Sequence, residues 1–332
     1  MVSLHEKVSN VENDSMFAKN IGTDYSYKHE IIWPYAIVFF IFNLLGLWGV
    51  VVLVTGVSYK TILWMFFVGY LGGQGITTGA HRYFTHKSYK ATPLLRAILV
   101  ALQTTSGQMS LITWCRDHRQ HHRYSDTDAD PHNAKRGFFF SHMGWLICKK
   151  NPLAIKCGRN IDISDLQADW MVMFQKKYYI PLYIVLAIFM VWVPKHYFGE
   201  DWLNAIFVVY FARYFLQLHF TLLVNSAAHL HGPRPYDGNI QPAESWIVSL
   251  LTFGEGWHNY HHAFPWDYKA AELSMHFNYS ASIIRFLEKI GLAYDLKTAS
   301  PEMVGNRIVR TGDGSHYTLS DNYQEHATAH AW

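Results

Sequence analysis

The sequence predicts an all-α integral membrane protein, with four transmembrane helices in two hairpins and a helical cap on the cytosolic side. Three observations predict this fold class. Half of the 332 residues are hydrophobic and only 16% are charged, against about 25% in an average soluble protein. Uncharged stretches long enough to cross a bilayer come in two pairs with short connectors. Lys and Arg gather in the chain between the two pairs.

Each predicted hairpin consists of two apolar stretches. A helix needs about 20 apolar residues to cross the hydrocarbon core of a bilayer, and four stretches approach or exceed that length. They comprise residues 31–54, 61–80, 178–194 and 202–228. The last contains one charged residue, Arg213. The two hairpins therefore occupy residues 31–80 and 178–228.

A fifth uncharged stretch, residues 97–115, contains several Gln, Thr and Ser side chains. We expect it to be a helix that is buried against the others or lies at the membrane interface, with a true span as the alternative. A span here would place His86 and His118 on opposite sides of the membrane.

Basic residues predict the orientation. Residues 82–177 contain fifteen Lys and Arg, whereas the connectors of the hairpins contain only Lys60 and Lys195. By the positive-inside rule, the basic segment and both termini face the cytosol. The predicted cytosolic parts are an N-terminal arm (1–30), two segments (81–177 and 229–315) and a flexible tail (316–332). A removable signal peptide is not expected, because the arm is polar and mixed in charge.

Composition excludes several other classes of protein. The aromatic and hydrophobic content excludes a disordered chain, a collagen and a coiled coil. The net charge is only +3, so we expect a lipid bilayer and no nucleic acid as a partner. The three cysteines (Cys115, Cys148 and Cys157) are too few for a disulfide scaffold and suit a reducing compartment.

Histidines cluster at the predicted cytosolic ends of the spans. The pattern H-x-x-H-H occurs twice, and positions i, i+3 and i+4 of a helix share one face. Asn225 precedes another histidine by one helical turn. His81 and His86 are five residues apart, so we expect the chain to bend between them. The nine clustered histidines are His81, His86, His118, His121, His122, His229, His258, His261 and His262.

Nine imidazoles are too many for one ion and suit two first-row transition metals, such as Fe, Zn, Cu or Ni. The predicted cap would therefore hold a dinuclear metal site. The alternative is a set of unrelated surface histidines. The remaining histidines are expected to be hydrogen-bonded or exposed and not to bind metal; they include His132, His142, His196, His219 and His231.

These strings resemble the three histidine boxes of the membrane acyl-CoA desaturases. The matching strings are HRYFTH at 81–86, HRQHH at 118–122 and GEGWHNYHH at 254–262. Residues 125–133, 225–229 and 310–314 are also similar to strings of that family. The resemblance covers roughly residues 25–315, and it is greatest to the stearoyl-type animal and insect branch.

The resemblance implies a di-iron centre with the nine histidines as ligands, and Asn225 holding a metal-bound water. It implies O2-dependent desaturation of a long-chain fatty acyl-CoA in the endoplasmic reticulum membrane. Electrons would come from cytochrome b5 and its NADH-dependent reductase. The sequence lacks the His-Pro-Gly-Gly string of a fused cytochrome b5, so the donor is expected to be a separate protein. No separate side-chain acid or base is assigned.

The resemblance also implies substrate contacts. Arg116, Asp117, Lys149 and Lys150 become candidates for binding the CoA headgroup, with solvated surface charge as the alternative for the two lysines. The sequence departs from the family pattern near this site, with Tyr35 and Met109 where Asn is usual and Leu222 where Trp is usual.

Two glycines are candidates for the acyl tunnel. Gly69 and Gly73 lie on one stripe of the second span with His81, about 18 Å and about 12 Å below it at 1.5 Å per residue. The alternative is that they allow close packing between helices.

Two other functions remain open: a di-iron fatty-acyl hydroxylase or acyl-lipid desaturase, and a metal carrier without catalysis. The clustered histidines lie at or beyond the ends of the spans, which disfavours a transport path. The position of the double bond, the preferred chain length and the oligomeric state are not fixed by the sequence.

Overall fold

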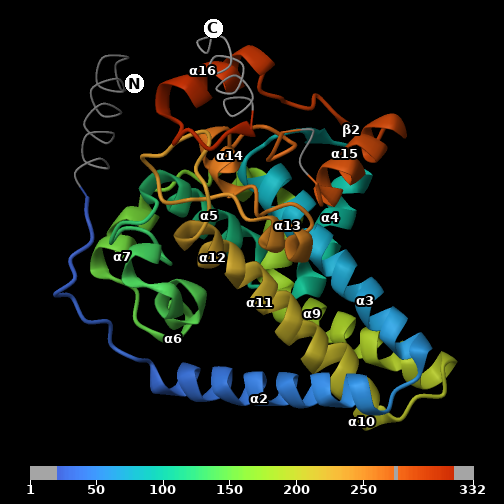
Figure 1. Cartoon of the computed structure of the whole chain (residues 1–332). Helices are drawn as coiled ribbons and strands as arrows, with labels where there is room; N and C mark the ends of the chain where they lie inside the picture. Colours follow the sequence, from blue (N-terminus) through green and yellow to red (C-terminus); the bar gives the residue numbers. More distant parts are fainter. Residues whose placement is uncertain (1–20, 273–275, 318–332) are drawn as a thin grey trace, which may run out of the picture.

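Long apolar helices and short cap helices divide the molecule into two parts (Figure 1). The computed structural model describes residues 21–272 and 276–317. The apolar part contains α2 (Trp33–Thr55), α3 (Tyr59–Gln74), the π-helix η1 (Gly75–Thr85), α4 (Pro93–Ser106), α9 (Trp170–Tyr197), α10 (Trp202–Ala205), the π-helix η4 (Ile206–Ala212) and α11 (Arg213–Asn225).

The cap is made of shorter elements. They are α5 (Leu111–Tyr124), η2 (Ala134–Arg136), η3 (Phe140–Gly144), α6 (Trp145–Ile147), α7 (Pro152–Arg159), α8 (Ser164–Ala168), α12 (Ala227–Leu230), α13 (Trp246–Thr252), α14 (His258–Ala263), α15 (Tyr279–Lys289) and α16 (Pro301–Thr311). The strands β1 (Lys90–Ala91) and β2 (Ala293–Tyr294) pair antiparallel, with Lys90 opposite Tyr294. This pair ties the chain after η1 to the chain after α15.

Within residues 21–272 and 276–317, three helices are long and apolar enough to cross a membrane: Trp33–Thr55, Trp170–Tyr197 and the helical run Trp202–Leu230. They correspond to the first, third and fourth predicted spans. The second predicted stretch, 61–80, is helical but divided, because the α-helical part of α3 ends after 16 residues and continues as η1. The prediction of a largely helical chain with membrane-length apolar helices is confirmed.

The first predicted hairpin does not pack as a pair. A short turn joins α2 to α3, yet α2 runs along the lower edge of the molecule and packs against η4 and α11 (Figure 1). Gly46 and Gly49 are the buried residues of α2. A Cβ at Gly46 would lie 2.4 Å from Phe215 Cβ, and a Cβ at Gly49 would lie 2.2 Å from the Phe207 carbonyl oxygen. Small residues thus let this helix approach its partner closely.

The third predicted span is the second half of a longer helix. α9 begins at Trp170, eight residues before the predicted start, and it kinks at Tyr178, whose φ and ψ are −110° and 19°. Pro181 explains the kink, because proline lacks the N–H of the helical ladder and its ring clashes with the preceding turn.

The expectation of one helix over residues 97–115 was wrong. α4 ends at Ser106, and Gly107 adopts left-handed φ (75°), which favours glycine. α5 then begins at Leu111 after the N-cap residue Ser110. The chain turns back at Gly107, so the alternative of a single span is also excluded, and His86 and His118 meet on one side.

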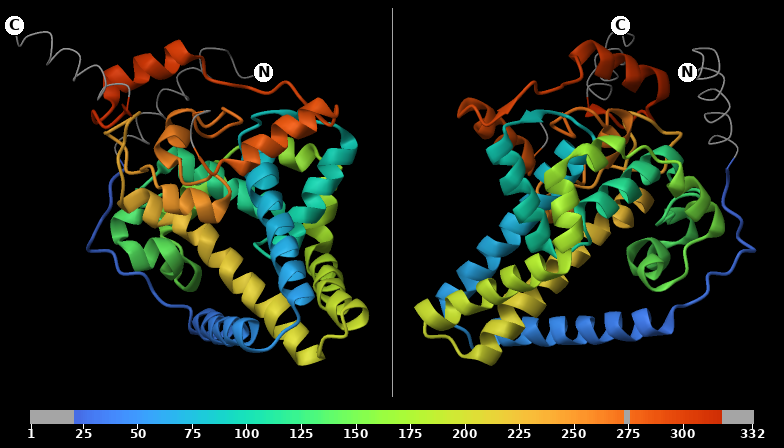
Figure 2. Two further views of the ribbon diagram at one scale, coloured as in Figure 1. Left: turned by 45° about the vertical axis from the view of Figure 1, so that its right-hand side comes forward. Right: turned by 180° about the vertical axis from the view of Figure 1, so that it is seen from behind.

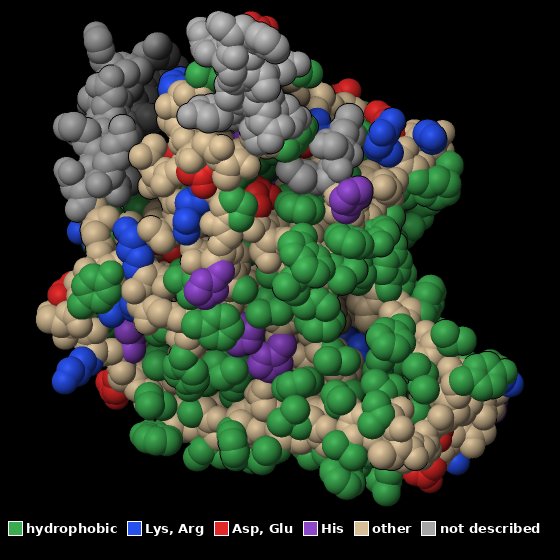
Figure 3. Space-filling view, viewed as in Figure 1, with side chains coloured by type: hydrophobic (Ala, Val, Ile, Leu, Met, Phe, Trp, Pro, Cys, Tyr) green, Lys and Arg blue, Asp and Glu red, His purple; other side chains and the backbone are tan. Residues whose placement is uncertain are grey.

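The surface separates by polarity. Hydrophobic side chains cover the lower part of the face seen in Figure 3, over α2 and its neighbours, whereas most charged side chains gather over the cap. Figure 2 shows the cap above the lower helices from two further directions. The described part of the N-terminal arm lies along the cap, where the Asp24 backbone N–H donates to Asp128 (2.9 Å). The first twenty residues and the tail from residue 318 lie outside the described residues.

The close crossing of α2 predicts the effect of one methyl group. Gly49→Ala should lower the free energy of unfolding by about 1–3 kcal/mol, because the added Cβ meets a backbone oxygen that cannot move aside. Gly56→Ala is the control, since a Cβ there meets nothing within 4 Å. Thermal unfolding of the detergent-purified variants measures both. Equal melting temperatures for the two variants would contradict the packing described for α2.

Candidate metal centre

The nine predicted histidines converge in the cap just above α3 and α11. They form two groups within which all the ligating nitrogens lie within 4.8 Å of one another. Group A comprises His81, His86, His118, His122 and His261. Group B comprises His121, His229, His258 and His262.

In both groups the Nε2 atoms point inward. In group A, His261 Nε2 lies 2.9 Å from His81 Nε2 and 2.9 Å from His122 Nε2. In group B, His258 Nε2 lies 3.0 Å from His229 Nε2 and 3.1 Å from His262 Nε2. Each group therefore surrounds a point with four or five ring nitrogens.

The two H-x-x-H-H helices supply both groups. On α5, His118 and His122 face group A, while His121 faces group B. On α14, His261 faces group A, and His258 and His262 face group B. The shared helix face predicted from the i, i+3, i+4 spacing is present, and it lies between the two groups.

The expected bend between His81 and His86 was wrong. The chain stays helical, but as the π-helix η1, in which hydrogen bonds run from i to i+5. The backbone N–H of His86 donates to the His81 carbonyl (3.2 Å). A spacing of five residues therefore places both side chains on one face, and both reach group A.

Buried carboxylates hold the outward-facing nitrogens of three histidines. His81 Nδ1 lies 2.8 Å from Glu255, His121 Nδ1 2.8 Å from Asp130, and His229 Nδ1 3.0 Å from Asp126. Such contacts fix the tautomer with Nε2 as the lone-pair nitrogen and raise its basicity. The sequence analysis did not assign these three residues. They lie in the strings that carried the resemblance, but the histidine spacing alone does not reveal them.

Ion pairs keep these carboxylates charged despite burial. Burial opposes ionisation of Glu255, but Arg82 and His81 together lower its pKa. Arg82 lies 2.9 Å from Glu255 and is itself buried. Burial likewise opposes ionisation of Asp126, whose pKa is lowered by His229 and His121. Negative charge therefore surrounds the histidines on their outer side.

Six of the nine imidazoles are neutral donors; at His121 burial opposes protonation, but the Asp130 carboxylate raises the pKa. Burial lowers the pKa of His86, His118 and His122 well below the ordinary value, and burial also lowers that of the three α14 histidines. His121 and His229 present Nε2 lone pairs to group B, because their Nδ1–H groups are directed at carboxylates. Converging lone pairs repel unless a cation lies between them, so the residues fit two metal ions.

Of the histidines set aside from the metal site, His142, His196, His219 and His231 are hydrogen-bonded or exposed, whereas His132 is buried and its Nδ1 has no hydrogen-bond partner in the described structure. His142 Nε2 lies 2.9 Å from His219 Nδ1, and His219 Nε2 lies 2.7 Å from Asn43. His231 is exposed. His132 lies beside group B, with its ring 4.4 Å from that of His121, and it could join His121 and Asp130 around an ion. Burial lowers the pKa of His132 to about 3.

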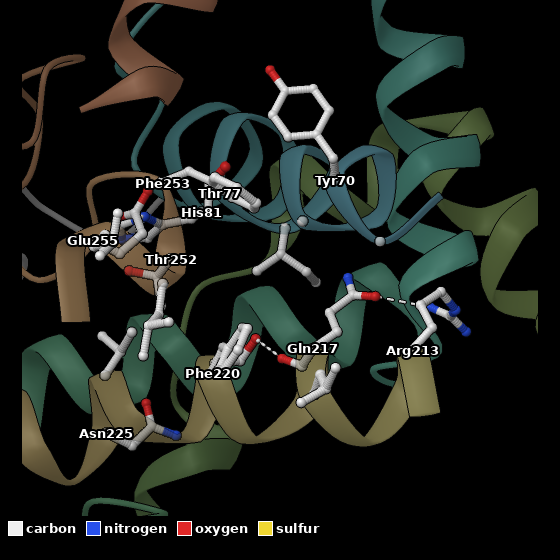
Figure 4. Close-up of a pocket in the computed structure, with 18 of the residues that line it drawn as sticks. Tyr70, Thr77, His81, Arg213, Gln217, Phe220, Asn225, Thr252, Phe253 and Glu255 are labelled. Carbon is white, nitrogen blue, oxygen red and sulfur yellow. Dashed lines mark hydrogen bonds and ion pairs between the residues drawn. The ribbon is translucent and has the colours of Figure 1, made fainter. Parts of the chain in front are cut away.

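Two apolar cavities meet at the metal centre. Cavity 1, of about 380 Å³, lies between α3 and α11 and is closed by the loop after α13 (Figure 4). Cavity 2, of about 530 Å³, lies between α2, α11 and the loop before α5. The residues that line both cavities are Trp114, His118, Thr221 and Asn225. Gly69 and Gly73 line cavity 1, together with His81.

Comparison with known proteins identifies the family. A family model described as fatty acid desaturase matches residues 60–294. The chain is 48% identical over 292 residues to an acyl-CoA Delta-9 desaturase of Acheta domesticus, which covers 87% of this chain and 81% of the relative. This chain belongs to the fatty acid desaturase family. The resemblance to animal and insect acyl-CoA desaturases is therefore confirmed, and the chain is an oxidoreductase.

Other relatives of this desaturase act at different positions. The chain is 47% identical over 291 residues to an acyl-CoA Delta(11) desaturase of Spodoptera littoralis (87% of this chain, 86% of the relative). It is 46% identical over 290 residues to the stearoyl-CoA desaturase of Homo sapiens (87% and 80%). Because relatives with different printed positions are almost equally similar, overall identity does not assign the position of the double bond.

The four candidate headgroup residues of the desaturase do not form one cluster. Arg116 and Lys150 each lie 2.7 Å from the Asp117 carboxylate, and Asp117 lines cavity 2. Lys149 instead pairs with Glu30 of the N-terminal arm at 2.8 Å, and both side chains are exposed. The structure thus gathers three of the four residues around Asp117, of which Asp117 itself lines the cavity.

The geometry predicts opposite results for two histidines of the desaturase. His121→Ala should remove about half of the bound metal while the protein still inserts in the membrane, because group B loses one of four imidazoles and group A keeps all five. His231→Ala should keep its metal content, since this exposed side chain belongs to neither group. Metal analysis of the purified variants by mass spectrometry is the measurement. Full metal content in the His121 variant would refute the assignment of group B.

Proposed function

We propose that this chain catalyses the O2-dependent desaturation of a long-chain fatty acyl-CoA at a di-iron centre, and that the double bond formed is cis. The observation that carries the proposal is the position of the two histidine groups between two apolar cavities that share four lining residues. An acyl chain that occupies both cavities passes the metal centre at their junction.

The nine histidines of groups A and B would hold the two irons. Asn225, at the end of α11, lines both cavities, and it would hold a metal-bound water at group B. Bound iron would supply the activation of O2 that removal of hydrogen from an unactivated methylene requires. Glu255, Asp126 and Asp130 orient three of the ligands from behind.

The cavities would bind the acyl chain in a bent conformation. Gln108 donates a hydrogen bond to Thr221 (2.9 Å) beside the junction, so α11 is joined there to the loop before α5. Trp114 stacks on His118 with ring centroids 5.0 Å apart and forms part of the wall on both sides. Both walls are predominantly apolar, so burial of methylenes would drive binding and exclude water from the centre.

The cation pair at Asp117 would bind the headgroup. Arg116 and Lys150 pair with Asp117, which lines cavity 2, and both cations line a separate hollow beside α7. Their charges suit the phosphates of CoA. Asp117 holds both cations in place and lies within the cavity wall itself.

We further propose a four-span protein of the endoplasmic reticulum membrane with both termini in the cytosol. The second span would be α3 continued by η1, because Gly75 keeps helical φ and ψ (−59°, −35°) at their junction. The cytosolic parts would be the segments predicted from the sequence, and residues 229–315 would complete the cap. Electrons would come from cytochrome b5 and its NADH-dependent reductase, docked on the basic cap.

Expression in a desaturase-deficient yeast tests the proposed reaction. We expect growth without added unsaturated fatty acid, and a product two hydrogens lighter than the saturated acyl chain. Mass spectrometry locates the double bond. A product that gains one oxygen would instead establish a hydroxylase, and products confined to intact lipids would establish an acyl-lipid desaturase.

The separation of the two neighbouring lysines provides a matched pair of variants. Lys150→Gln should raise the KM for acyl-CoA about tenfold, the size of one lost charge-assisted hydrogen bond. Lys149→Gln should change it less than about twofold, because that side chain pairs with Glu30 on the exposed surface. Steady-state assays with matched iron content measure both. An equal effect of the two substitutions would reject the headgroup site at Asp117.

A further inference from the structure

The wall of cavity 1 is formed by two ladders of residues. On α3 and η1 the residues lining it at intervals of four are Met65, Gly69, Gly73, Thr77 and His81. On α11 they are Arg213, Gln217, Thr221 and Asn225. Both helices lead toward the cap, so His81 and Asn225 lie at the metal end and Arg213 at the far end (Figure 4), where Met65 is the last lining residue of the α3 ladder.

Gly69 and Gly73 project no side chain into the far half of cavity 1. Side chains from other elements occupy that space instead. A Cβ at Gly73 would lie 2.6 Å from the Phe253 ring, and a Cβ at Gly72 would lie 2.8 Å from Gln217 Nε2. A Cβ at Gly69 would make ordinary contact, 3.5 Å, with Arg213 Cγ. The amide of Gln217 therefore reaches across from α11 to the backbone of α3.

Hydrogen bonds fix this crossing side chain. Arg213 Nη1 donates to Gln217 Oε1 (2.8 Å) and to the Thr105 carbonyl (3.3 Å), and Arg213 Nε donates to the Val209 carbonyl (3.2 Å). Figure 4 shows the contact between Arg213 and Gln217. Both residues are buried, at 2% and 9% exposure. Moving the pair aside would leave buried donors without acceptors, which is costly.

The pair presents polar groups to an otherwise apolar cavity. Arg213 Nη2 and Gln217 Nε2 are buried and have no hydrogen-bond partner in the described structure. A terminal methyl group of an acyl chain offers no acceptor to either atom. An apolar tail therefore gains by filling the cavity as far as Gln217, and gains nothing by displacing the pair.

We propose that the Arg213–Gln217 pair closes the acyl cavity and sets the longest tail that the desaturase accepts. This proposal rests on the proposed function. In this proposal residues of α11 limit the length of the acyl tail, whereas Gly69 and Gly73 on α3 leave the space that the Arg213–Gln217 pair fills. Gln217 lies one helical turn nearer the metals than Arg213, so its removal would extend the cavity by about 6 Å, four residues at 1.5 Å each.

The test is the chain-length profile of variants at position 217. Gln217→Ala should shift the preferred acyl-CoA toward longer tails by about four carbons, and raise turnover on the longer chain relative to the wild-type optimum about tenfold. Gln217→Leu keeps most of the side-chain volume and should keep the wild-type profile. Val68→Ala is the control, because Val68 is a buried residue of α3 that does not line cavity 1. Iron content is measured in every variant.

An unchanged profile in an active Gln217→Ala variant overturns the proposal. If the Gln217→Ala variant does not insert in the membrane, crosslinking of the unaltered protein tests the proposal instead. An acyl-CoA with a photoreactive diazirine at the tail terminus should crosslink within residues 213–217 or to the facing glycines of α3. Crosslinks confined to α2 or to the cap would also overturn it. If the unaltered protein desaturates none of the acyl-CoAs, the proposed function has failed; desaturation with an unshifted profile rejects only the role of the pair.

Discussion

Nine imidazoles converge in a buried space, and the rest of the cap depends on what balances their inward-facing lone pairs. The closest Nε2 atoms lie 2.9 to 3.3 Å apart in both groups. Three of the rings are held by carboxylates that direct their lone pairs inward, so each group presents electron-rich nitrogens suited to a cation. The elements η1, α5, α12 and α14 all contribute histidines to this centre. A pair of metal ions would therefore also stabilise the fold of the cap.

The scaffold around the centre shows how a membrane protein can place such a site. The π-helix η1 brings His81 and His86 to one face and continues a helix that lines the acyl cavity, so one element reaches both metal and substrate. Asp126 adopts a left-handed backbone conformation (φ 58°) and is held by the backbone N–H of Ala134 at 3.1 Å. Its strained loop places a carboxylate behind His229. The π-helix and the Asp126 loop are local features, but their roles depend on contacts that form only when the cap is assembled.

The parts of the site that depend on local periodicity could be predicted from the sequence. The faces of α5 and α14 follow from the i, i+3, i+4 spacing of their histidines, and the apolar helices follow from uncharged stretches. The contribution of η1 could not, because a five-residue spacing indicates a bend in an α-helix and one face in a π-helix. The break at Gly107 had a local sequence signal, because a glycine is followed by Ser110, an N-cap residue for the next helix. The uncharged stretch 97–115 suggested one continuous helix instead. Glu255 and the crossing of α2 over η4 depend on contacts far apart in the sequence.

The central claim is that this protein holds two irons in the two histidine groups. Iron quantification combined with X-ray absorption at the iron edge, on the wild-type protein purified in detergent, tests it most directly. The account predicts two irons per chain, each in a nitrogen-rich environment dominated by imidazole. A single metal per chain, or zinc in four-coordinate sites, would contradict it.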